Sequence, residues 1–180
     1  MRKATLERKT KETEIIIKIG EQTRISTGVG FYDHMLELLA FRSGLQLDIK
    51  ARGDLHVDNH HTIEDVGITL GLAIAKMLGD KLGIARYGSA RIPMDECLAQ
   101  VDLDISNRPF LVFNAILKDE MVEEFFRALA FNAGITLHIN LLYGKNEHHK
   151  CEAIFKAFGC ALKQAIEKSG EEVPSTKGVL

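Results

Sequence analysis

Two pairs of neighbouring histidines, each followed three residues later by a glutamate, are the residues of this chain best suited to chemistry. The first run is His60-His61-Thr62-Ile63-Glu64 and the second is His148-His149-Lys150-Cys151-Glu152. Four of the seven histidines therefore belong to two copies of one pattern. Imidazole nitrogen combined with carboxylate oxygen is typical of sites for Mn, Fe, Co, Ni or Zn. The repetition predicts a metal site.

The spacing within each run predicts that the two histidines do different things. On a helix His60 and Glu64, or His61 and Glu64, can share a face. Adjacent side chains diverge by about 100° around a helix, so the two histidines of a pair point in different directions. Each pair would then serve two metals, or one metal and a substrate. The alternative is a pair of exposed histidines at a helix start, but a helix N-terminus disfavours positive charge and gives no reason for a repeat.

The repeat extends beyond the histidines and predicts an internal duplication. The two runs are 88 residues apart, and at the same offset Gly71-Leu72-Ala73 corresponds to Gly159-Cys160-Ala161. Upstream, residues 40–49 resemble residues 130–139 at an offset of 90. A longer loop in the first half absorbs the difference. A repeat of this kind fixes the architecture.

Hydrophobic patterning predicts the same elements in both halves. The predicted strands are Glu14–Ile19, Arg24–Ser26, Leu45–Ile49, Cys97–Ile105, Phe110–Leu117 and Ile135–Leu141, and the predicted helices are Phe31–Arg42, Thr62–Leu78, Met121–Asn132 and His149–Lys168. Each half is β-β-α-β-α. We therefore expect an α+β protein with sheets covered by helices. No linker separates the halves, so we expect a single domain over residues 1–180, with halves of about 1–88 and 89–180.

The duplication also predicts a further ligand in each half. His34 lies near the start of the first predicted helix, and its counterpart at the offset of 90 is Glu124. Histidine and glutamate are both competent ligands. The candidate ligands are His34, His60, His61, Glu64, Glu124, His148, His149 and Glu152.

Composition excludes several classes of function. The net charge of −2 argues against a nucleic-acid partner. Apolar residues make up 46% of the chain, with no run long enough to span a bilayer. The N-terminus lacks the apolar core of a signal peptide, and the three cysteines show no disulfide or metal spacing. We expect a cytoplasmic protein with no membrane partner.

Several basic and hydroxyl residues could bind a phosphate. Arg86, Arg108 and Lys156 are cationic, and the C-terminal run Pro174–Leu180 combines hydroxyls, a lysine and a glycine. Taken singly, each is more often a surface charge or a helix stop. A common role requires that they converge on the metals.

At this point the motifs match a known family. The chain resembles imidazoleglycerol-phosphate dehydratase in Thr10–Thr13, Asp33–Leu36, His60–Asp65, Arg86–Gly88, Pro93–Glu96, Asn107–Pro109, His148-His149 with Glu152-Ala153 and Phe155–Ala157, and Pro174–Gly178. The resemblance covers nearly the whole chain. It implies two similar halves and an assembly of 24 subunits with octahedral symmetry. In that assembly neighbouring subunits build each active site around two Mn²⁺ ions.

The resemblance also implies roles for individual residues. Glu12 matches the family's acid–base glutamate, and all the candidate ligands match the family's ligands except Glu124, where the family often has histidine. We keep Glu124 as a substituted ligand. Leu38 is a second departure, because many members have a substrate-contacting glutamine there. The implied substrate-binding residues are Arg86, Arg108, Lys156, Ser175, Thr176 and Lys177.

The implied activity is the dehydration of D-erythro-imidazole glycerol phosphate to imidazole acetol phosphate in histidine biosynthesis. The substrate's imidazole would bind both metals as an imidazolate and expel the hydroxyl through a diazafulvene-like intermediate. Glu12 would shuttle the proton. Two other classes remain open: a dinuclear metallohydrolase, and a non-catalytic metal-binding assembly protein. A Glu12→Gln variant that loses turnover but keeps its metal would leave the non-catalytic alternative without support.

Overall fold

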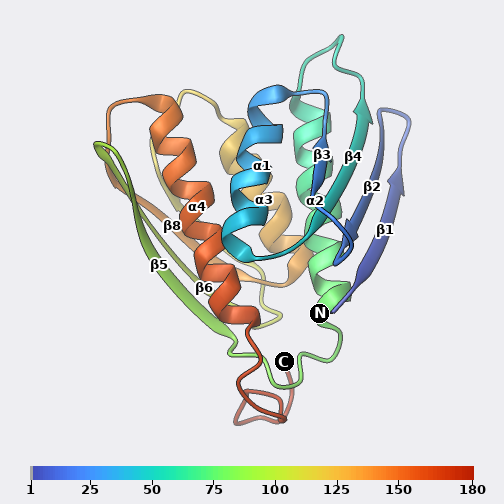
Figure 1. Cartoon of the computed structure of the whole chain (residues 1–180), viewed down its shortest axis with the longest axis vertical. Coiled ribbons are helices and arrows are strands. Elements are labelled where there is room, and N and C mark those ends of the chain that lie inside the picture. The colour runs from blue at the N-terminus through green and yellow to red at the C-terminus, as the bar shows by residue number, and fades with distance from the viewer. Residues whose placement is uncertain (1) are drawn as a thin grey trace.

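The molecule consists of two four-stranded sheets with four helices between them (Figure 1). The computed structural model describes residues 2–180. The first half contains β1 (Ala4–Lys9), β2 (Thr13–Ile19), β3 (Arg24–Ser26), α1 (Gly30–Ser43), β4 (Leu47–Gly53) and α2 (His60–Leu78). The second half contains β5 (Tyr87–Met94), β6 (Cys97–Asp104), β7 (Phe110–Asn114), α3 (Met121–Ala133), β8 (Thr136–Tyr143) and α4 (Glu147–Ile166).

The two sheets have the same topology. Their strand orders are β1-β2-β4-β3 and β5-β6-β8-β7. In each sheet the first two pairings are antiparallel and the last, β3 with β4 or β7 with β8, is parallel. The predicted order β-β-α-β-α is present in both halves, and one further strand, β1 or β5, precedes it. The predictions of an α+β fold, an internal duplication and sheets covered by helices are confirmed.

One hydrophobic core runs through both halves. Alternate residues of β2, namely Ile15, Ile17 and Ile19, are buried under the helices, as period-two patterning predicts. Within this core Phe126 of α3 packs against Phe155 of α4 with ring centroids 4.9 Å apart. Burying each such side chain contributes about 1.5–3 kcal/mol. No helix within residues 2–180 is long and apolar enough to cross a bilayer.

Glycines let the two halves meet backbone to backbone. A methyl group placed on Gly71 of α2 would lie 2.5 Å from the carbonyl oxygen of Leu129 on α3. The equivalent methyl on Gly159 of α4 would lie 3.0 Å from the carbonyl oxygen of Leu39 on α1. The remaining neighbours also correspond: Asn132 Cβ and Ala133 N for Gly71, and Arg42 Cβ and Ser43 N for Gly159. The offsets of 88 and 90 in the sequence are therefore reproduced in these contacts.

Replacing Gly71 by alanine is expected to lower the free energy of unfolding by about 1–3 kcal/mol, because the added methyl overpacks the contact between α2 and α3. This clash outweighs the gain of about 1 kcal/mol that alanine brings to a helix interior. Chemical denaturation measures the difference. Gly30→Ala is the control, since a methyl there meets nothing within 4 Å in α1. Equal stability of Gly71→Ala and wild type would contradict the assigned contact.

Candidate metal centre and active site

All four helices begin at the same end of the molecule (Figure 1). Both histidine pairs occupy the first turn of a helix, His60-His61 in α2 and His148-His149 in α4. The side chain of Asn146 caps α4 by accepting hydrogen bonds from the backbone N–H groups of His148 and His149, at 2.9 and 3.2 Å. The helix starts thus gather at one end the side chains that the sequence predicts to be ligands.

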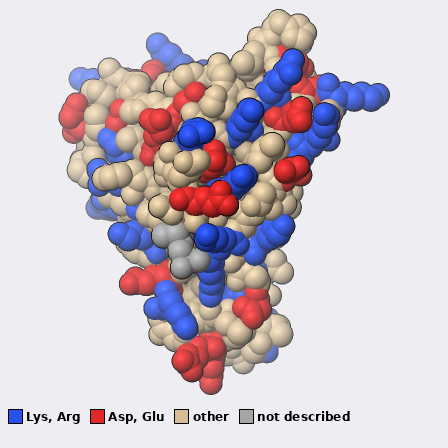
Figure 2. All heavy atoms as spheres, turned by 45° about the vertical axis from the view of Figure 1, so that its right-hand side comes forward, with Lys and Arg blue, Asp and Glu red and all other residues tan. Residues whose placement is uncertain are grey.

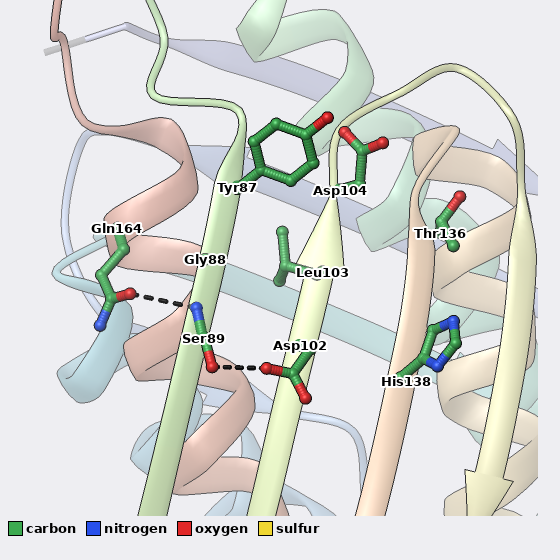
Figure 3. Close-up of a pocket in the computed structure, with 9 residues that line it drawn as sticks. All are labelled: Tyr87, Gly88, Ser89, Asp102, Leu103, Asp104, Thr136, His138 and Gln164. Atoms are coloured by element: carbon green, nitrogen blue, oxygen red, sulfur yellow. Dashed lines mark hydrogen bonds between the residues drawn. The ribbon is translucent and has the colours of Figure 1, made fainter.

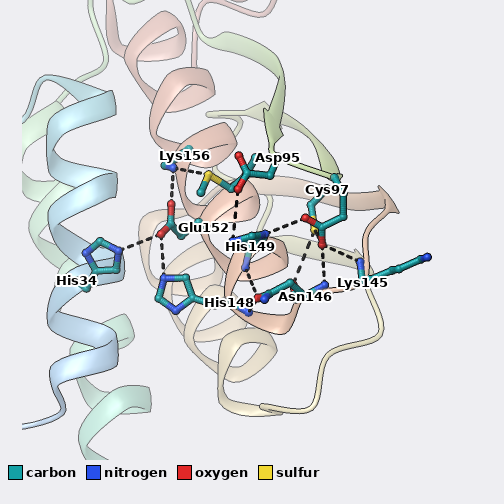
Figure 4. Close-up of polar contacts among 11 residues, drawn as sticks. His34, Asp95, Cys97, Lys145, Asn146, His148, His149, Glu152 and Lys156 are labelled. Atoms are coloured by element: carbon teal, nitrogen blue, oxygen red, sulfur yellow. Dashed lines mark hydrogen bonds and ion pairs between the residues drawn. The ribbon is translucent and has the colours of Figure 1, made fainter.

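One compact cluster joins α1 to α4. His34 Nε2 lies 3.2 Å and His148 Nε2 lies 2.9 Å from Glu152 Oε1 (Figure 4). Their ligand atoms all lie within 4.8 Å of one another, and this is the group of that kind found among residues 2–180. The two imidazoles stack with centroids 5.6 Å apart. Two imidazole nitrogens and one carboxylate oxygen form a donor set that fits a first-row divalent ion.

Glu152 stays ionised in this cluster although its side chain is only 10% exposed. Burial acts to raise its pKa, but hydrogen bonds from Lys156, His34 and His148 outweigh burial and lower the pKa to about 2. Lys156 contacts Oε2, whereas both imidazoles face Oε1. The carboxylate is therefore charged at neutral pH, as a metal ligand must be.

His149 points away from this cluster (Figure 4). It is held by Glu96, which lies in the turn between β5 and β6. Its Nδ1 lies 2.8 Å from Glu96 Oε2, while Glu96 Oε1 accepts from the backbone N–H of Asn146 at 2.7 Å. That backbone bond, followed by the His149 bond, lowers the pKa of Glu96, and Glu96 raises the pKa of His149. A carboxylate on Nδ1 leaves Nε2 as the ligating nitrogen, which is the usual arrangement at metal sites.

Replacing Glu96 by glutamine is expected to weaken metal binding about 10- to 100-fold, because the charged partner that orients His149 is lost. The pKa of His149, followed by NMR titration of the metal-free protein, should fall in the same variant. Glu147→Gln is the matched control, since Glu147 begins α4, next to the histidine pair, but bonds Lys118 N and Lys150 instead of a histidine. An unchanged metal affinity would show that Glu96 serves only the turn.

The corresponding residues of the first half are arranged more loosely. His60 Nε2 lies 3.6 Å from Glu64 Oε2. His61 Nδ1 lies 3.0 Å from Asp54 Oδ2 and 4.0 Å from Glu12 Oε2. The hydrogen bond that His61 donates to Asp54 raises the pKa of His61, and the same bond lowers the pKa of Asp54. Asp54 thus does for His61 what Glu96 does for His149.

Glu124 lies near the start of α3, the helix that packs against α2. Its carboxylate is 3.6 Å from Arg127 Nε, and it is not part of the compact cluster described above. Leu38 lies on α1 and is packed against the core. Of the predicted site residues, the structure therefore brings His34, His148 and Glu152 together. It places His60 near Glu64, and Glu12 within 4.0 Å of His61. Glu124 lies beside an arginine.

Glu12 lies in the turn between β1 and β2, in an open hollow of about 330 Å³. Lys9, Lys11 and Arg52 line the same hollow. Basic and acidic side chains are interspersed over the face of the molecule that Figure 2 shows. An anionic ligand would find positive charge next to the candidate acid–base residue.

The predicted phosphate-binding residues are split between two places. Arg86 Nε bonds Asp104 Oδ1 at 2.7 Å and Arg86 Nη1 bonds Pro174 O at 2.9 Å. Arg108 also reaches Asp104, at 3.3 Å. The C-terminal segment, including Ser175, Thr176 and Lys177, is at the end of the molecule opposite the helix starts (Figure 1). Of the predicted phosphate-binding residues, all of which lie within residues 2–180, only Lys156 contacts a predicted metal ligand of its own chain, Glu152.

A second hollow, of about 500 Å³, lies on the outer face of the β5-β6-β8-β7 sheet (Figure 3). Ser89 donates to Asp102 there, and Gln164 accepts from the backbone N–H of Ser89 at 3.1 Å. His138 also lines it, but none of the predicted site residues does. Ser89, Asp102 and Gln164 bond one another instead of converging on a common point. The helix starts therefore remain the candidate site.

Asp54 and Glu96 were not predicted to have a role. Glu96 lies within the motif Pro93–Glu96, and Asp54 comes directly after β4. Both are brought to a histidine by tertiary structure, and no sequence spacing indicates either contact.

Comparisons with known proteins agree with this fold and indicate a family. A sequence model described as imidazoleglycerol-phosphate dehydratase matches residues 27–162. The imidazoleglycerol-phosphate dehydratase of Acetivibrio thermocellus is 56% identical over 193 residues, covering 99% of each chain. The crystal structure of the enzyme from Staphylococcus aureus has 46% identity and a TM-score of 0.85, covering 93% of this chain and 99% of that one. The Pyrococcus furiosus structure, in complex with (S)-C348, has 43% identity and a TM-score of 0.88, covering 97% and 100%.

The family match and the shared fold place the chain among the hydro-lyases, enzymes that break a carbon–oxygen bond and release water. The class is set by relatives that match over the whole chain. The chain belongs to the imidazoleglycerol-phosphate dehydratase family.

Proposed function

We propose that the chain is a manganese-dependent dehydratase that converts D-erythro-imidazole glycerol phosphate to imidazole acetol phosphate. Family membership supports the dehydration and its place in histidine biosynthesis. The single observation that carries the metal dependence is the convergence of His34, His148 and Glu152.

Two Mn²⁺ ions per active site are proposed, one for each of the repeated sets. His34, His148 and Glu152 would hold one ion, and His60, Glu64 and Glu124 the other. His61 and His149 hydrogen-bond a carboxylate through Nδ1, so each would give its Nε2 to an ion. Each points in a different direction from the first histidine of its pair. When bound, the metal supplies Lewis acidity to the substrate's imidazole ring.

The protein's own residues would handle the proton and the phosphate. Glu12, exposed and 4.0 Å from His61, would take the proton from carbon and pass it to the leaving hydroxyl. Arg86, Arg108, Ser175, Thr176, Lys177 and Lys156 would hold the phosphate and thereby fix the substrate's register. In one chain most of these residues lie at the end opposite the predicted ligands (Figure 1).

That separation supports a site built between chains. A neighbouring copy that brings its Arg86 end to the helix starts would complete the phosphate site. We propose that this occurs in an assembly of 24 subunits with octahedral symmetry, in the cytoplasm. Ligands shared between subunits would make assembly depend on metal.

The test is turnover of imidazole glycerol phosphate by metal-stripped protein, before and after addition of Mn²⁺. Ketone product that appears only with Mn²⁺ is the expected result. Metal-loaded, folded protein that forms no product would overturn the proposal. Release of inorganic phosphate in place of ketone would identify a metallohydrolase, which uses a metal-bound hydroxide.

A further inference from the structure

The two halves offer equivalent positions to a metal but different ligands. The two halves pack against each other through equivalent residues. Gly71 contacts Leu129, Asn132 and Ala133 on α3. Gly159 contacts the equivalent residues of α1, Leu39, Arg42 and Ser43. Each α3 residue is 90 positions after its α1 counterpart, and so is Glu124 relative to His34. Glu124 therefore holds on α3, which packs against α2, the position that His34 holds on α1, which packs against α4. His34 contacts the His148–Glu152 pair of α4 directly, whereas the contact of Glu124 is with Arg127.

The surroundings of the two positions differ as well. Arg127 Nε lies 3.6 Å from Glu124, and Arg127 also contacts Glu123. The residue equivalent to Arg127 in the first half is Glu37, which has the opposite charge. Position 34 is thus a histidine with a glutamate three residues later, and position 124 is a glutamate with an arginine three residues later. Without metal, Arg127 balances the extra carboxylate of the second position.

This inference rests on the proposed dinuclear site. We infer that the two metal positions are chemically unequal and that Glu124 makes one of them selective for manganese. The His34 position has two imidazoles and one carboxylate from its own chain, whereas the Glu124 position has one imidazole and two carboxylates. Imidazole suits Zn²⁺, and carboxylate suits Mn²⁺. A metal at the Glu124 position also competes with Arg127 for the charge of this carboxylate, so this position fills second.

The experiment compares zinc and manganese titrations of the metal-stripped full chain, by calorimetry for Zn²⁺ and by the EPR signal of free Mn²⁺. Wild type is expected to bind two Mn²⁺ per chain. For Zn²⁺ the second equivalent should bind at least about tenfold more weakly than the first. Changing the partner of a metal ligand lowers metal affinity by about tenfold or more, and replacing a histidine ligand by glutamate should have at least that effect on zinc. In Glu124→His the two zinc affinities should converge.

Glu123→His is the matched control, because Glu123 neighbours Glu124 and contacts the same arginine. It should keep the unequal zinc titration. Glu124→Gln, which is close in size to the native residue, should lose the second Mn²⁺ while its circular dichroism stays native. Two equal zinc affinities in wild type, or a Glu124→His titration identical to wild type, would overturn the inference while leaving the proposed dehydratase intact. Protein that binds no Mn²⁺ would overturn both.

Discussion

Replacing Glu12 by glutamine is expected to lower kcat by about 10²- to 10⁴-fold, the usual contribution of a positioned acid–base group. The side chain keeps its size but loses its ability to take a proton. Metal content should be unchanged, because Glu12 approaches His61 only at 4.0 Å while Asp54 holds the same ring at 3.0 Å. Steady-state kinetics with metal analysis of the same sample measures both quantities.

Glu7→Gln serves as the control for Glu12, since it removes an exposed carboxylate from the neighbouring strand β1. It should behave as wild type. Full turnover in Glu12→Gln would assign proton transfer to another group. A parallel loss of metal would mean that Glu12 acts through the metal site.

Replacing Glu152 by glutamine is expected to weaken metal binding by more than about a hundredfold. Losing the hydrogen-bond partner of a ligand lowers metal affinity by about 10- to 100-fold, and this variant loses a proposed ligand itself. Turnover should fall with metal content. Glu152 is also the meeting point of His34, His148 and Lys156, so the variant leaves a largely buried lysine without its charged partner. Metal titration followed by kinetics at saturating Mn²⁺ separates affinity from turnover.

The same variant should change how stability depends on pH. In the metal-free protein the pKa of Glu152 is lowered from 4.5 to about 2. A carboxyl with a lowered pKa stabilises the fold above its unfolded pKa, and this contribution is lost as the pH falls from about 4.5 towards 2. Denaturation across this range should show a shallower decline for Glu152→Gln than for wild type. Glu167→Gln, at the exposed end of α4, should retain the wild-type slope.

Most of the fold was predictable because its signals are local. The helix predicted from Thr62 begins two residues earlier, at His60, and ends at Leu78 as predicted. The strands β1 and β5 were missed. Residues 4–9 are dominated by charged and exposed side chains, and β5 contains Gly88 and Pro93, which are poor strand formers. Both are edge strands, where proline and charge are tolerated, and pairing with β2 or β6 makes them strands.

The site divides in the same way. His148 and Glu152 are one helical turn apart, so their contact follows from spacing alone. His34 could be predicted as a ligand only from the internal duplication, because α1 and α4 are far apart in sequence and no spacing links them. The partners Asp54 and Glu96 depend on where β4 and the β5–β6 turn lie in space, which hydrophobic patterning does not specify. The distance between Arg86 and the helix starts is likewise a property of the whole fold.

The matched glycine contacts between the halves have a consequence for the origin of the chain. Gly71 of the first half contacts Leu129 of the second, and Gly159 of the second half contacts Leu39 of the first. Equivalent surfaces of the two halves therefore contact each other reciprocally. That is the signature of a two-fold symmetric dimer interface. A half-length ancestor could have formed this four-layer structure as a homodimer. Fusion of two copies keeps the symmetric packing but lets positions 34 and 124 evolve separately, and only then can one hold histidine and the other glutamate.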